Sequence, residues 1–183
     1  MAFLVDIVDP NNNNAVIGQV WADWWVNPYT GDIYKVPVGY DPINTINAVT
    51  DIYKILPITG SPSQGLPWNI ASVIAIDLGV NISNLYDSYQ AGGMHDLQRT
   101  APDGTSYGGF VPDFRNIASF DFGLAASTVG LAPTEILAAG GLYNWKQSLT
   151  NPNVKTEGMW WNNTPNDENI LRACPQLEDS QLV

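Results

Sequence analysis

The chain of 183 residues contains one cysteine, Cys174, and one histidine, His95. A lone cysteine excludes a disulfide framework and any zinc site built on several thiolates. With one imidazole as well, a metal centre would need nearly all of its ligands to be oxygens, so we expect no metal and no cofactor. The fold must therefore depend on burial of apolar side chains. Hydrophobic residues make up 45% of the sequence, which is sufficient for a substantial core at this length.

The charge of the chain limits the kinds of ligand that it can bind. Lys and Arg number 7 against 18 Asp and Glu, which gives a formal net charge of -11. Binding to nucleic acid depends on Lys and Arg side chains that neutralise phosphates, and the seven here are scattered without a basic stripe. The composition therefore argues against DNA as a partner. The 7 tryptophans, together with many Asn and Asp residues, favour a site for neutral polar ligands such as sugars.

The pattern along the chain predicts a single domain over residues 1–183, mainly α (α+β), compact and helical, with a small β-hairpin near the N-terminus. We interpret residues 1–39 as an extended lead-in, in which β-formers flank a turn at 27–32. Residues 40–174 are predicted to form the helical core. Residues 175–183 are predicted to be a tail that is frayed.

Start and stop signals divide the predicted core into helices. Asp41 and Pro42 are typical of a helix N-cap followed by a proline in the first turn, and Thr164 and Pro165 repeat this pattern. The predicted helical regions cover residues 41–56, 68–90, 113–128, 133–145 and the chain from 164 onwards.

No segment predicts a membrane span, because no run approaches the roughly 18 apolar residues that a span requires. The best candidate, residues 70–76, is interrupted by Ser72 and followed by Asp77. The first residues also lack the basic leader of a secretory signal. We therefore expect no stable membrane insertion, and we expect any export to depend on a dedicated secretion system with its own carrier.

Residues 92–99 read Gly-Gly-Met-His-Asp-Leu-Gln-Arg and carry several candidate chemical groups. His95 suits proton transfer near neutral pH, and Asp96 is placed to orient its ring. Arg99 is suited to binding an anionic group. The alternative is a glycine pair that ends a helix, followed by a surface histidine, and the residues alone leave both interpretations open.

Asp121 lies between two phenylalanines in the most apolar predicted helix. A charged group there is expected to be paired or functional. Glycoside cleavage needs one protonated acid and one ionised partner, and apolar surroundings raise the pKa of the acid. Asp23, Glu135 and Glu157 are further acids with apolar or aromatic neighbours. Among these candidates, Asp121 is the one whose surroundings most favour chemistry.

Several segments, taken in order, resemble the polymorphic toxin type 44 domain. They are Gly-Gly-Met-His-Asp-Leu-Gln at 92–98, Phe-Asp-Phe-Gly at 120–123 with the Ala- and Gly-rich sequence that follows it, and Trp-Asn-Asn-Thr-Pro at 161–165. The resemblance covers about residues 85–174. His95 stands where that family usually has Trp, and Asp121 stands where it has Asn. The Asp-Leu pair at Asp96 is kept.

The resemblance implies a toxin that bacteria deliver into competitors, with a cognate immunity protein that protects the producer. Together with the composition, it leads us to expect an enzyme that hydrolyses peptidoglycan, most directly its glycan strand, in the periplasm of the target cell. His95, Asp96 and Asp121 are the predicted catalytic residues. The predicted substrate-binding residues are Arg99, Asn144, Trp160 and Trp161.

Two other hypotheses remain open on the sequence. One is a nuclease that acts in the cytosol, with His95 as general base and Arg99 or Arg115 at the phosphate. The other is a non-enzymatic toxin that perturbs membranes through the Ala- and Gly-rich segment 122–142, although ordinary helix packing explains that segment equally well.

Overall fold

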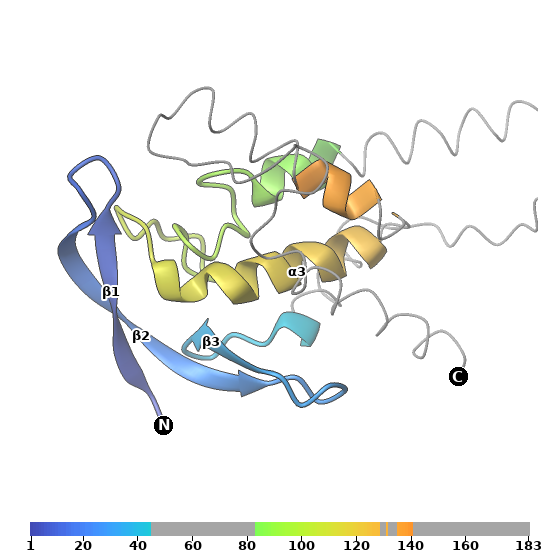
Figure 1. The fold of residues 1–183 in the computed structure, drawn as a ribbon, viewed down its shortest axis with the longest axis horizontal. Helices are drawn as coiled ribbons and strands as arrows, with labels where there is room; N and C mark the ends of the chain where they lie inside the picture. Colours follow the sequence, from blue (N-terminus) through green and yellow to red (C-terminus); the bar gives the residue numbers. More distant parts are fainter. Residues whose placement is uncertain (45–82, 129–130, 132–134, 141–183) are drawn as a thin grey trace, which may run out of the picture.

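The computed structural model describes residues 1–44, 83–128, 131 and 135–140 of the chain. In these residues a three-stranded antiparallel sheet packs against a helix (Figure 1). The strands, in spatial order, are β1 (Phe3–Asp9), β2 (Ala15–Val26) and β3 (Ile33–Pro37). The helix is α3 (Arg115–Thr128), which follows directly on a short 3-10 helix, η1 (Pro112–Phe114).

Asparagine-rich turns join the strands. Between β1 and β2, Asn13 and Asn14 adopt positive φ angles of 50° and 56°, a region that Asn tolerates better than most residues. Between β2 and β3, the side-chain oxygen of Asn27 accepts a hydrogen bond of 2.9 Å from the backbone N–H of Tyr29. Because β2 and β3 pair in antiparallel register on either side of this turn, the hairpin predicted around residues 27–32 is confirmed.

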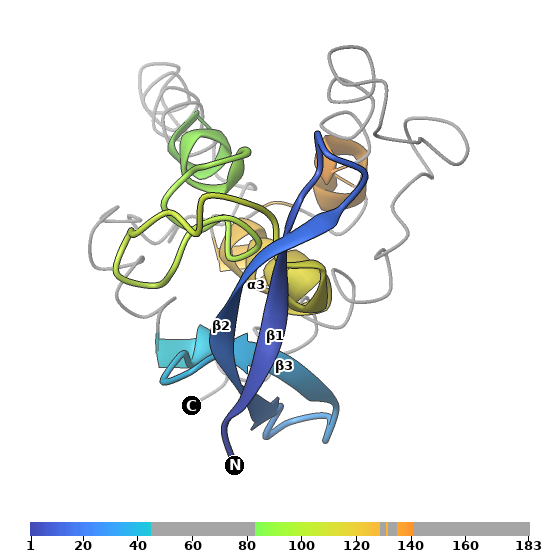
Figure 2. The same ribbon diagram turned by 90° about the vertical axis from the view of Figure 1, so that its left-hand side faces the viewer.

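Strand β2 presents different faces to the core at its two ends. In the half that pairs with β1, Ala22 is fully buried, whereas in the half that pairs with β3 it is Trp25 that packs on the core. Side chains alternate along a strand, so coiling of β2 must bring both residues inward. Figures 1 and 2 show this curvature. As a result, Trp21 and Trp24 are both exposed, by 57% and 52%, on opposite faces of the strand.

Helix α3 packs across the sheet through residues at helical spacing. Ile117 and Phe120 are fully buried, and Leu124 is nearly so. The ring of Phe120 lies 5.6 Å from that of Trp25 and 5.2 Å from that of Tyr34, measured between centroids. This contact joins the middle of α3 to the β2–β3 hairpin and forms the main core of the described structure.

A second apolar cluster lies on the other side of α3. It is formed by Leu85, Ala125, Ala126 and Ile136. The helical residues 83–89 and 135–140 contribute to it, and both segments lie on the side of α3 opposite β3 (Figures 1 and 2). Helix α3 is therefore covered from two sides, and its middle turns lie between two cores.

The prediction of a mainly helical fold is wrong. About a third of the described residues are helical and a little over a quarter lie in strands. The sequence pattern predicted one hairpin, but β1 adds a third strand. Val5 and Ile7 of β1 are buried, whereas the alternating Leu4 and Asp6 are exposed. Buried and exposed side chains thus alternate, as in a strand that is buried on one face, so these residues form a strand and not only an extended lead-in.

The helix predicted over residues 113–128 is confirmed as the last residues of η1 followed by α3. The start predicted at Asp41 is also confirmed, because residues 42–44 are helical and the Asp41 carboxylate accepts the backbone N–H of Ile43 at 3.1 Å. The helices predicted within 45–82 and beyond 140, and the predicted tail, lie outside the described residues. Within the described part, no helix has the length and apolar character needed to cross a membrane.

Candidate functional site

Asp121 lies in the middle of α3 and is fully buried. Its position follows from its neighbours: Phe120 packs into the core against the sheet, and Phe122 packs against the second cluster. The carboxyl group therefore lies within the protein between two apolar regions. The Tyr89 hydroxyl donates a hydrogen bond of 2.8 Å to its Oδ2 atom.

The surroundings of Asp121 raise its pKa to about 7. Burial is the main cause, because it disfavours the charged carboxylate. The hydroxyl groups of Tyr40 and Tyr89 lower this pKa, with a smaller effect than burial has. Near neutral pH, protonated and ionised forms of this carboxyl group are therefore both populated, which is the property a general acid or base requires.

Tyr89 connects Asp121 to the only histidine of the chain. The His95 ring stacks on the Tyr89 ring, with centroids 5.4 Å apart and an angle of 27° between the planes. Phe122 meets the same tyrosine edge-on at 5.7 Å. His95 is partly buried, and this burial lowers its pKa. The imidazole is therefore neutral at pH 7 and able to accept a proton.

The glycine pair before His95 has a structural cause. Gly92 has a φ angle of 79°, which favours glycine. A Cβ atom at Gly93 would lie 2.4 Å from the backbone oxygen of Ser88, so that position has no room for a larger residue. The same oxygen accepts the backbone N–H of His95 at 2.9 Å. Close approach of the loop to the end of helix 83–89 thus brings His95 onto Tyr89.

Asp96 holds this loop together. Its side chain is only 4% exposed, and its Oδ2 atom accepts hydrogen bonds from the backbone N–H of Gly92 at 2.8 Å and from Nη1 of Arg99 at 2.9 Å. Its backbone oxygen accepts the N–H groups of Arg99 and Thr100, both at 2.8 Å. These contacts bind Asp96 to its own loop, so its geometry fits a residue that positions His95.

Arg99 extends from Asp96 toward an aromatic ring. Its guanidinium carbon lies 5.0 Å from the centroid of Phe110, and that of Arg115 lies 5.8 Å from the same centroid. Of the predicted site residues, the structure thus brings His95 and Asp121 onto the same tyrosine, with Asp96 next to them in the loop. Arg99 instead lies at Phe110. Asn144, Trp160 and Trp161 lie outside the described residues.

Sequence reasoning missed Tyr89 and Tyr40. Neither residue belongs to a motif, and the only local signal at Tyr89 is its place one turn before the glycine pair. The described residues also contain no cluster of three or more His, Cys, Asp or Glu side chains that would hold a metal ion.

The chain matches no protein-family model, no curated protein and no solved structure.

Proposed function

We propose that this protein is a delivered antibacterial effector that hydrolyses peptidoglycan in the target periplasm, most directly its glycan strand. The observation that carries the proposal is Asp121, a buried carboxyl group with a pKa of about 7 that is linked through Tyr89 to a neutral histidine. Glycosidases require a carboxylic acid that remains protonated near neutral pH, and apolar burial is how proteins produce one.

In the proposed reaction, the C–O bond of the glycosidic linkage breaks and its oxygen leaves with a proton. The Tyr89 hydroxyl delivers this proton and takes a replacement from Asp121, because the two groups share a hydrogen bond. His95 accepts a proton from the water whose oxygen bonds to the anomeric carbon. Exchange with solvent then returns the proton from His95 to Asp121. Asp96 acts as a positioning residue that fixes the loop carrying His95.

The delivery part of the proposal rests on the resemblance of residues 85–174 to the type 44 toxin domain. It implies a secretion-system carrier and a cognate immunity protein as partners. The net charge of -11 supports a substrate other than a polyphosphate chain.

The direct test is digestion of purified sacculi, with the release of soluble fragments measured over time. We expect Asp121→Asn to lower the rate by about 100-fold or more, since general acids contribute on the order of 10²–10⁴. Asp87→Asn is the matched control, because Asp87 is exposed on the helix that carries Tyr89. Equal rates for the two variants, or intact sacculi with the unaltered protein, would falsify the proposal.

A second test compares toxicity in two cell compartments, the periplasm and the cytosol. We expect toxicity when the chain is expressed with an export signal and little toxicity when it stays in the cytosol. Toxicity confined to the cytosol, with degradation of RNA or DNA by the purified protein, would instead favour a nuclease that uses His95 with Arg99 or Arg115.

A further inference from the structure

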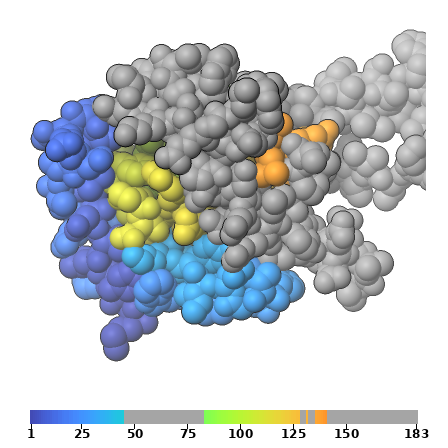
Figure 3. Space-filling model, in the orientation of Figure 1, coloured from blue at the N-terminus to red at the C-terminus, as the bar shows by residue number. Residues whose placement is uncertain are grey.

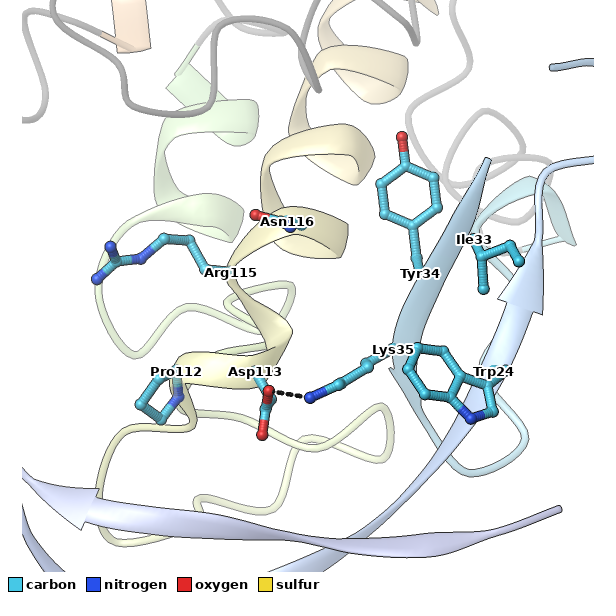
Figure 4. Close-up of a pocket in the computed structure, with 8 residues that line it drawn as sticks. All are labelled: Trp24, Ile33, Tyr34, Lys35, Pro112, Asp113, Arg115 and Asn116. Carbon is cyan, nitrogen blue, oxygen red and sulfur yellow. Dashed lines mark hydrogen bonds and ion pairs between the residues drawn. The ribbon is translucent and has the colours of Figure 1, made fainter. Parts of the chain in front are cut away.

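A groove of about 380 Å³ opens between β3 and the start of α3 (Figure 4). It is distinct from the surroundings of Asp121, and its lining is a mixture of aromatic, charged and amide side chains. The residues that matter for its chemistry are Trp24, Lys35, Asp113, Arg115 and Asn116. Figure 3 shows atoms of the hairpin and of α3 at the surface on the face drawn.

The indole of Trp24 is exposed but held in place. It remains 52% exposed, although Phe3 packs against it at 5.0 Å between ring centroids. Lys35, its direct neighbour on β3, places its ammonium 5.9 Å from the indole centroid and forms an ion pair with Asp113. A flat ring fixed in this way is a suitable platform for the apolar face of a sugar ring, because little side-chain freedom remains to be lost on binding.

Basic side chains lie near the same groove, and aspartates pair with two of them. The described residues include the basic side chains of Lys35, Arg99 and Arg115, and all of them lie around η1 and Phe110. Arg115 is exposed and makes no ion pair with any described residue. Because Asp113 neutralises Lys35 within the groove, Arg115 is the lining cation that no described residue neutralises, and it favours an anionic group on the ligand.

We propose that this groove binds a saccharide chain that carries carboxylate groups. One sugar ring stacks on Trp24, Asn116 bonds to hydroxyl or amide groups, and Arg115 binds a carboxylate. Trp24 and Arg115 lie on opposite sides of the Lys35–Asp113 ion pair (Figure 4), so a ligand that contacts both must cross that pair and exceed one ring.

The identification of this saccharide as peptidoglycan glycan rests on the proposed function, since that strand alternates a neutral amino sugar with one that carries a lactyl carboxylate wherever no stem peptide is attached. Helix α3 connects the two places. Arg115 and Asn116 lie in its first turn and Asp121 follows five residues after Asn116, a rise of about 7.5 Å along the helix.

Binding is measured by calorimetry on the full chain carrying Asp121→Asn, so that cleavage does not remove the ligand. The probes are a glycan tetrasaccharide stripped of peptides, neutral chitotetraose and an oligoglutamate peptide. We expect the acidic glycan to bind about tenfold more tightly than chitotetraose, and we expect no binding of the peptide. Comparable binding of the peptide would overturn the proposal in favour of an acidic-peptide site.

The decisive variants are Trp24→Ala and its matched control Trp21→Ala, since Trp21 is equally exposed on the other face of β2. We expect at least a tenfold loss of affinity with the first and none with the second. Trp24→Phe keeps a ring against Phe3 and should lose only a few-fold, which guards against a folding defect. Arg115→Gln should abolish the preference for the acidic glycan. Equal affinities for the Trp24→Ala and Trp21→Ala proteins would refute the proposal that the groove binds the saccharide.

The two proposals fail separately. If the unaltered protein binds the glycan through Trp24 but leaves sacculi intact, the hydrolase proposal fails and the groove stands. If sacculi are cut and the Trp24 and Arg115 variants bind and cut normally, the groove proposal fails and the hydrolase stands.

Discussion

Asp96 and Asp121 are the two buried carboxyl groups of the described residues, and they differ in the groups that surround them. Asp96 lies in a loop, where its carboxylate accepts hydrogen bonds from a backbone N–H and from the Arg99 guanidinium. Asp121 lies in a helix between two apolar clusters, where the Tyr89 hydroxyl donates to its carboxyl group, so burial dominates and its pKa rises to about 7. Both acids are buried, so they differ in their surroundings: a backbone N–H and a guanidinium tie Asp96 to its loop, whereas burial between apolar clusters sets the pKa of Asp121.

The largest effect that separates the two acids is the pH dependence of stability. The pKa of Asp121 rises from 3.8 to about 7 on folding, so the folded state binds more protons than the unfolded state between these values. Its contribution is fully present below about pH 4 and is lost as the pH rises to about 7, a total on the order of 4 kcal/mol.

This slope is measured by urea unfolding of the unaltered and Asp121→Asn proteins from pH 4 to 8. The difference between the two curves isolates Asp121 from His95, whose lowered pKa makes stability rise with pH on the acid side. A difference that does not change with pH would contradict the raised pKa of Asp121.

The next effect concerns Asp96. We expect Asp96→Ala to lower the free energy of unfolding by about 2 kcal/mol, because it removes the hydrogen bond from the Gly92 N–H and the ion pair with Arg99. Chemical denaturation at constant pH measures this loss. A change below about 1 kcal/mol would show that the loop does not depend on Asp96, and the contrast with Asp121 would then disappear.

An effect of similar size tests whether the Tyr89 hydroxyl carries the proton in the proposed reaction. Tyr89→Phe keeps the ring that stacks on His95 but removes the hydroxyl that bonds Asp121. We expect the rate of sacculus digestion to fall about 30-fold, or about 2 kcal/mol of barrier. Because the hydroxyl lowers the pKa of Asp121, its loss should also move the alkaline limb of the pH–rate profile to higher pH. Tyr86→Phe, an exposed tyrosine change on the same helix, should alter neither the rate nor the profile.

Part of this structure follows from local sequence. The spacing of Ile117, Phe120 and Leu124 is helical, and it also places Asp121 inside the helix at a buried position, so burial of that acid is predictable. The turn at 27–32 is likewise written in residues that favour turns. The sequence predicts the residues of β1 only as part of an extended lead-in, because packing of the sheet on α3 decides which of their side chains are buried.

The contacts that define the site and the groove depend on tertiary packing. Tyr89 and Asp121 are 32 residues apart in sequence, and their hydrogen bond requires the helix at 83–89 to pack beside α3. Trp24 lines the same groove as Asp113 and Asn116 only because the hairpin folds back onto η1. No local pattern encodes these distances, and a single sequence therefore indicated the candidate acids but not their partners.

The smallest predicted effect comes from a second ion pair, whose two side chains are both partly exposed, in contrast to buried Asp96. Lys35 and Asp113 form an ion pair whose side chains are 33% and 38% exposed. Water and salt screen such a pair, so we expect Asp113→Ala to lower the free energy of unfolding by less than about 1 kcal/mol. Denaturation in low and high salt measures this term, which should shrink further as salt is added. A loss as large as that of Asp96→Ala would mean that the pair holds the hairpin onto η1, and that it acts as a structural clasp in the groove.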